Sequence, residues 1–198
     1  MTSSIMPAPS PARTGVWIGI AAISMAFAAF TSALLVRQGA APDWRHFDLP
    51  RILYANTFVL LLSSGTIAVA ARRLTAGWEL AADRPPGAVV GAGAGLAWLV
   101  VTLLLGLLFV AGQLVAWRSL AAQGLYLATN PSSSFFYVFT AAHALHLLGG
   151  IVALGYLLLR LRVEPARPRE RALAAVTLYW HFMDALWLYL LLVLALRL

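Results

Sequence analysis

Five long runs of apolar residues constrain this chain more than any other feature. They cover residues 15–36, 53–71, 88–115, 135–159 and 173–196. A helix needs about 20 predominantly apolar residues to cross the hydrocarbon core of a bilayer, and each run reaches or approaches that length. Of the 198 residues, 62% are hydrophobic and only 11% are charged, which leaves no room for a second, soluble domain. We therefore expect an all-α membrane protein, a bundle of five transmembrane helices.

The first 14 residues differ from the rest of the chain. They are rich in proline and serine and carry a single charge, Arg13. A secretory signal peptide would have a basic start and a small-residue cleavage site, and neither is visible. We expect a disordered tail over residues 1–14, followed by one transmembrane domain over residues 15–198.

All 14 basic residues are arginine, and the net charge is +7. The arginines lie at the ends of the apolar runs, which favours contact with lipid headgroups over nucleic-acid binding. Nine lie on the side of the N-terminus and five on the other, so the positive-inside rule predicts a cytoplasmic N-terminus and a periplasmic C-terminus. The candidate headgroup contacts are Arg72, Arg73, Arg118, Arg160 and Arg162. With no cysteine, the chain has no disulfide, thiolate metal site or c-type haem attachment.

Polar residues inside the last two runs are the candidate functional groups. His143 and His146 lie three apart, and so do His181 and Asp184, so each pair is expected to share a helix face. Three interpretations compete: a zinc, iron or copper site, a haem held between facing helices, and a structural network tying the fourth helix to the fifth. We favour the network, because intramembrane polar groups usually pair with one another. The predicted polar seam consists of His143, His146, Trp180, His181, Asp184 and Trp187.

Four stretches together resemble subunit III of the haem–copper terminal oxidases. They are AHALHLLGG (142–150), YWHFMDALWLYLL (179–191), ANTFVLLLSSGT (55–66) and the stretch 112–140. Each stretch is weakly specific alone, but the set spans nearly the whole chain after the tail. The resemblance implies the short, five-helix bacterial form of the family.

The resemblance also implies a role in the bacterial plasma (inner) membrane. The family's subunit III is a non-catalytic accessory subunit that packs against the catalytic subunit I of a cytochrome c oxidase, alongside subunit II and others, and binds structural phospholipid. Haem and copper belong to the partner subunits, so none is expected in this chain. Residues of the predicted polar seam match family positions, as do Asn56, Thr57, Ser64 and Gly65.

One departure from the family pattern and several alternatives remain. Ala22 and Ile23 stand where the family usually has a Ser–Glu pair. Other subunits bind the electron donor, so this chain can also belong to a quinol oxidase or be a nitric-oxide-reductase-associated homologue. An alternative of another class is a small membrane haem or metal protein using the His143, His146, His181 and Asp184 cluster. A transporter is less favoured, because no broken helix or paired repeat is visible.

Overall fold

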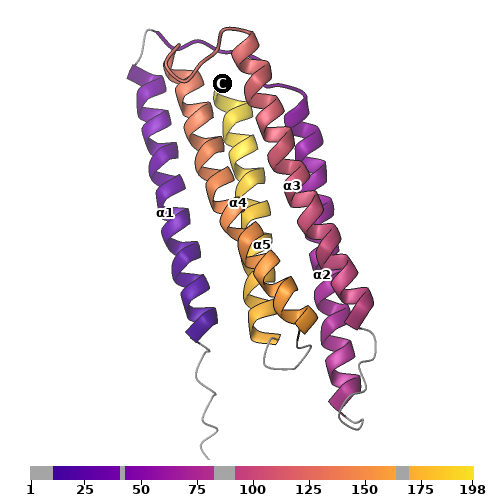
Figure 1. The fold of residues 1–198 in the computed structure, drawn as a ribbon. Coiled ribbons are helices and arrows are strands. Elements are labelled where there is room, and N and C mark those ends of the chain that lie inside the picture. The colour runs from indigo at the N-terminus through magenta and orange to yellow at the C-terminus, as the bar shows by residue number, and fades with distance from the viewer. Residues whose placement is uncertain (1–10, 41–42, 83–91, 164–169) are drawn as a thin grey trace, which may run out of the picture.

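The computed structural model describes residues 11–40, 43–82, 92–163 and 170–198. Its elements are five α-helices (Figure 1): α1 (Pro11–Ala40), α2 (Ile52–Ala82), α3 (Ala92–Ala122), α4 (Pro131–Val163) and α5 (Glu170–Arg197). All five are long and apolar enough to cross a membrane. The predicted all-α, five-helix membrane fold is confirmed.

Each helix extends beyond its predicted apolar run at one end or both, although residues 88–91 of the third predicted span lie outside the described residues. α1 begins at Pro11, so the end of the expected tail is helical, while residues 1–10 lie outside the described part. α4 begins at Pro131, where a missing N–H costs no helical hydrogen bond. The Asn130 side chain caps this helix, because its Oδ1 accepts a hydrogen bond of 2.8 Å from the Ser133 backbone N–H.

Four of the helices form a closed ring of neighbours, and the fifth packs outside it. α2 lies against α3, α3 against α4, α4 against α5, and α5 against α2, whereas α1 contacts α4 and α5 (Figure 1). The most extensive of these contacts is between α2 and α3. Gly112 on α3 leaves room for the Asn56 side chain there, and Gly95 does the same for Leu74. Such small residues let membrane helices approach closely.

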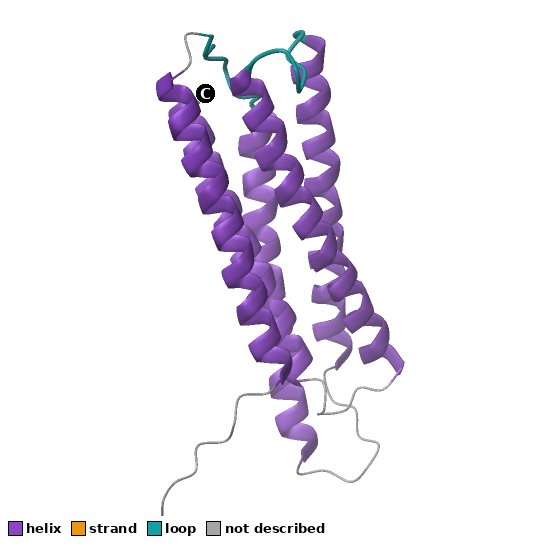
Figure 2. Ribbon diagram, turned by 90° about the vertical axis from the view of Figure 1, so that its left-hand side faces the viewer, coloured by secondary structure: helices purple, strands orange, loops and turns teal. Residues whose placement is uncertain are grey.

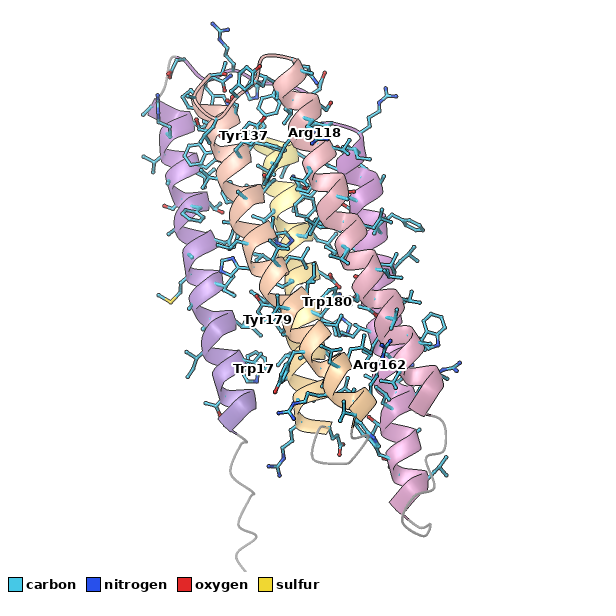
Figure 3. All side chains as sticks on the ribbon, in the orientation of Figure 1. Trp17, Arg118, Tyr137, Arg162, Tyr179 and Trp180 are labelled. Atoms are coloured by element: carbon cyan, nitrogen blue, oxygen red, sulfur yellow. The ribbon has the colours of Figure 1, made fainter. Side chains whose placement is uncertain are left out.

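The two described loops gather at one end of the bundle, together with Leu198 (Figure 2). The backbone N–H of Phe47 donates to the Leu198 carbonyl oxygen at 2.9 Å, and Trp44 Nε1 donates to the Arg197 carbonyl oxygen at 3.3 Å. We call this the loop end. Arg118 lies toward it and Arg162 toward the opposite end (Figure 3).

Candidate functional site

Three side-chain hydrogen bonds connect α5 to α2 in the interior of the bundle. Each joins a nitrogen of an α5 aromatic side chain to a hydroxyl group of α2. The pairs are Trp180 Nε1 to Ser63 Oγ at 3.0 Å, His181 Nδ1 with Ser64 Oγ at 2.7 Å, and Trp187 Nε1 to Thr57 Oγ1 at 2.9 Å. Residues 180–187 of α5 and the hydroxyl residues Thr57, Ser63 and Ser64 of α2 therefore form one polar interface.

This interface differs from the one expected, which tied α5 to the histidines of α4. Between α4 and α5 the contacts are mainly ring packing, with the His143 and Trp187 ring centroids 5.1 Å apart. One hydrogen bond does cross, from the Tyr179 hydroxyl to the His146 carbonyl oxygen at 3.0 Å. The acceptor in this bond is a backbone oxygen, so the pattern of side chains along the sequence could not predict it. The hydrogen-bonded partner of α5 is mostly α2, because α2 presents three hydroxyl groups toward it.

The two histidines of α4 contact different helices, although they lie three residues apart. His143 is fully buried next to Phe109 of α3, and neither ring nitrogen has a hydrogen-bond partner within the described residues. His146 lies 6.0 Å from the Phe27 ring of α1, and its Nδ1 is 2.7 Å from the Ala142 carbonyl oxygen of its own helix. Residues three apart are about 60° apart around a helix of 3.6 residues per turn. In this closely packed bundle an angle of that size lets the two histidines face different helices, α3 and α1.

Asp184 is buried but makes no hydrogen bond within the described chain. The residue is 4% exposed, and both carboxyl oxygens lack a partner there. It lines a narrow crevice between α2 and α5, together with Thr57, Leu60, Leu61, Trp187 and Leu188. Asp184 belongs to the predicted polar seam, but it makes no hydrogen bond to a histidine or tryptophan of that seam.

The four residues of the metal or haem alternative do not converge. His143 faces α3, His146 faces α1, and His181 faces α2. In the described ranges, no three side chains of His, Cys, Asp or Glu lie together as metal ligands would. A first shell of histidine and carboxylate ligands requires such convergence, so the arrangement favours helix packing over metal or haem ligation by these residues.

Side-chain hydrogen bonds also join three other pairs of neighbouring helices, through residues whose pairing the sequence did not predict. The bonds are Thr31 Oγ1 with Tyr189 Oη at 2.8 Å, Thr66 Oγ1 with Thr102 Oγ1 at 2.8 Å, and Trp117 Nε1 to Thr140 Oγ1 at 3.0 Å. They link α1 to α5, α2 to α3, and α3 to α4. Their position as polar residues within apolar runs indicated that these side chains face other helices. Which residue each one bonds to follows only from the packing of the helices.

Ile23, at the position of the family's usual glutamate, belongs to the hydrophobic core. It is 9% exposed and lies in the same buried cluster as Phe27. Its neighbour Ala22 is exposed. In this chain that part of α1 contributes apolar contact in place of a carboxyl group.

The candidate lipid-contact arginines are exposed; three lie near the C-terminal ends of α3 and α4, whereas Arg72 and Arg73 lie inside α2, which continues to Ala82. Arg72, Arg73, Arg118 and Arg162 are exposed. Arg160 is also exposed, and its Nε donates to the Tyr156 hydroxyl at 2.9 Å. Their positions suit headgroup contact, which stays a prediction.

Comparison with known proteins supplies the family. The family model described as "Cytochrome c oxidase subunit III" matches residues 21–196. A probable cytochrome c oxidase subunit 3 of Nocardia farcinica is 38% identical over 92 residues, which is 46% of this chain and 45% of that protein. A probable quinol oxidase subunit 3 of Staphylococcus saprophyticus is 26% identical over 184 residues, 90% of this chain and 85% of that protein. The quinol oxidase subunit 3 of Bacillus spizizenii is 28% identical over 182 residues, 89% and 82% respectively.

The match to the Nocardia protein spans less than half of that relative, whereas the family model covers nearly all of this chain. The five membrane-spanning helices agree with a multi-pass protein of the bacterial inner membrane. The chain belongs to the cytochrome c oxidase subunit III family, the subunit III of the haem–copper oxidases.

Proposed function

We propose that this chain is the non-catalytic accessory subunit of a bacterial haem–copper oxidase that takes electrons from cytochrome c and reduces dioxygen to water. The observation that carries the choice of donor is the identity of 38% to a cytochrome c oxidase subunit, against 26% and 28% to quinol oxidase subunits. In this proposal, haem and copper reside in partner subunits, and this chain stabilises subunit I.

The arrangement of polar groups supports a scaffolding role. The side chains of Trp180, His181 and Trp187 on α5 hydrogen-bond to hydroxyl groups of α2, so these polar groups join helices. Hydrogen bonds of this kind hold membrane helices in a defined packing, because lipid tails offer no competing partner. A rigid bundle of this type can support the neighbouring catalytic subunit without taking part in electron transfer.

A quinol oxidase is the second candidate. The quinol oxidase relatives match 89–90% of this chain, about twice the share matched by the Nocardia protein. The length of the aligned region therefore favours quinol as the electron donor, whereas the percentage of identical residues favours cytochrome c.

The experiment is to purify the complex from its own membranes through an affinity tag on this chain. We expect oxygen consumption with reduced cytochrome c, together with the haem and copper spectra of a co-purifying subunit I. Oxygen consumption with quinol alone would identify the second candidate. Purification of this chain without any haem–copper subunit would overturn the accessory role.

Phospholipid binding is part of the same proposal. Arg72 and Arg73 lie side by side in α2, both exposed, and guanidinium groups pair well with phosphate. We expect the R72Q/R73Q double variant to retain less phospholipid in native mass spectrometry of the complex. Equal lipid retention by the variant would remove these two arginines from the proposal.

A further inference from the structure

Hydrogen-bond donors are scarce around the buried carboxyl group of Asp184. Thr57, which lines the same crevice, donates its only proton to the Leu53 carbonyl oxygen at 2.8 Å. The indole N–H of Trp187 donates to Thr57. The hydroxyl group that interacts with the carboxyl is that of Ser64, although the contact falls short of a full hydrogen bond. Ser64 is therefore the group on which the state of the carboxyl depends.

Ser64 contacts both Asp184 and His181, and a hydroxyl group has a single proton to donate. Its Oγ lies 2.7 Å from His181 Nδ1. If Nδ1 carries no proton, Ser64 donates to it and can only accept from the carboxyl, so the carboxyl must be protonated. If Nδ1 carries a proton, Ser64 accepts from it and can donate to an ionised carboxyl. The hydrogen-bond geometry allows both arrangements.

Charge distinguishes the two arrangements, because an ionised Asp184 would have no arginine beside it. The residue is 4% exposed and lies near the middle of α5. No arginine lies between residues 52 and 71 of α2 or between residues 172 and 196 of α5. Arg72, the first arginine of α2 after Ser64, is eight residues away, about 12 Å along the helix. An ionised carboxyl is costly at such a position, whereas a protonated one is uncharged and supplies its own donor.

The other ionisable groups inside the bundle leave this balance unchanged. His143 packs against aromatic rings of α3 and α5, and neither of its ring nitrogens has a hydrogen-bond partner in the described ranges. His146 faces α1. Residues 14–36 of α1 and 92–117 of α3 contain no Asp, Glu, His or Arg. Among the histidines of the described helices, only His181 is linked to the Asp184 carboxyl, through the Ser64 hydroxyl.

We propose that Asp184 is a proton-binding site: its carboxyl group is protonated at neutral pH and donates to Ser64 Oγ, which in turn donates to His181 Nδ1. His181 is then neutral and carries its own proton on Nε2. The bound proton joins α5 to α2 in the apolar interior, where an ionised carboxyl would oppose their packing. The inference goes beyond the proposed function and does not depend on it, because all three groups belong to this chain.

Infrared spectroscopy of the tagged complex distinguishes a protonated carboxyl from an ionised one. The difference spectrum between the unsubstituted complex and D184N at neutral pH should contain the C=O stretch of a protonated carboxylic acid. D43N is the matched control, because Asp43 is exposed and forms an ion pair with Arg37 at 3.1 Å, so its difference spectrum should contain carboxylate bands. Carboxylate bands that disappear in D184N would overturn the proposal.

Two adjacent serines test which hydroxyl group accepts the proton of Asp184. S64A removes the proposed acceptor, so the C=O band assigned to Asp184 should shift. S63A removes the hydroxyl group that accepts from Trp180 Nε1 and should leave that band in place. A band that stays in place in S64A, or that shifts equally in S63A, would refute the assignment of Ser64.

Thermal melting of the D184N complex gives an independent test. The amide matches the protonated acid in size and charge and can donate to Ser64, so the melting temperature should equal that of the unsubstituted complex. A markedly lower melting temperature would show that the charge is required and would overturn the proposal. If the tagged chain purifies without a haem–copper subunit, the proposed function fails, while the same spectra of the purified chain still decide whether Asp184 holds a proton.

Discussion

At the residue scale, the hydroxyl groups of α2 act as acceptors for the large polar side chains of α5. Trp180 and Trp187 are both fully buried, and each indole N–H has one hydroxyl partner. A buried indole needs such a partner, because its N–H has no water to bond in a membrane. The spacing of seven residues between the two tryptophans puts both on one face of α5, next to α2.

Substitution of Trp187 by phenylalanine tests the value of one such bond. W187F removes the donor to Thr57 Oγ1 but keeps an aromatic ring beside Phe109 and His143. We expect a loss of about 1 kcal/mol in the free energy of unfolding, measured by denaturant titration in detergent micelles. W17F is the control, since Trp17 is 51% exposed; equal effects of the two substitutions would contradict the role of the bond.

At the scale of elements, glycine positions decide how closely α2 and α3 approach. A Cβ added at Gly112 would collide with the Asn56 amide. That amide is itself held in place, because Asn56 Nδ2 donates to the Phe109 carbonyl oxygen at 3.4 Å. The contact between Gly112 and Asn56 therefore fixes the position of α2 relative to α3 along the helix axes.

Replacement of Gly112 by alanine should push the two helices apart or displace Asn56. We expect G112A to lower the free energy of unfolding by about 1–3 kcal/mol, the usual cost of overpacking. The matched substitution is G149A, at an exposed helical glycine where a Cβ would meet nothing within 4 Å. It should leave stability unchanged or raise it by up to about 1 kcal/mol, because alanine favours the helix. A destabilised G149A with an unaffected G112A would refute the packing argument, and the same micelle titration measures both.

At the scale of the whole molecule, the distribution of arginine predicts the orientation in the membrane, which the shape of the bundle does not. The opposite end of the bundle carries Arg72, Arg73, Arg160, Arg162 and Arg171, and the loop end carries Arg37, Arg45, Arg51, Arg118 and Arg197. The excess of arginine over the whole sequence lies on the side of the N-terminus. The positive-inside rule therefore still predicts that the loop end faces the periplasm.

Single cysteines can test this orientation directly, because the chain has none of its own. Leu127 at the loop end and Val163 at the opposite end are both exposed. We expect a membrane-impermeant thiol reagent to label L127C in intact spheroplasts, and to label V163C only after the membrane is permeabilised. The reverse pattern would invert the proposed topology.

The sequence by itself determined the number of helices and their transmembrane character, because the cost of exposing backbone or charge to lipid depends on local composition alone. It also identified the residues that carry the family pattern, including Trp180, His181, Asp184 and Trp187. Only the tertiary structure decided which helix each of them meets. His143 and His146 diverge to α3 and α1, and the side chains of Trp180, His181 and Trp187 bond to hydroxyls of α2. These choices depend on which neighbour lies beside each helix face, a long-range property that spacing along one helix does not contain. Asp184 is the clearest case: its sequence context indicated a partner within the chain, and the packing left it facing a crevice between α2 and α5.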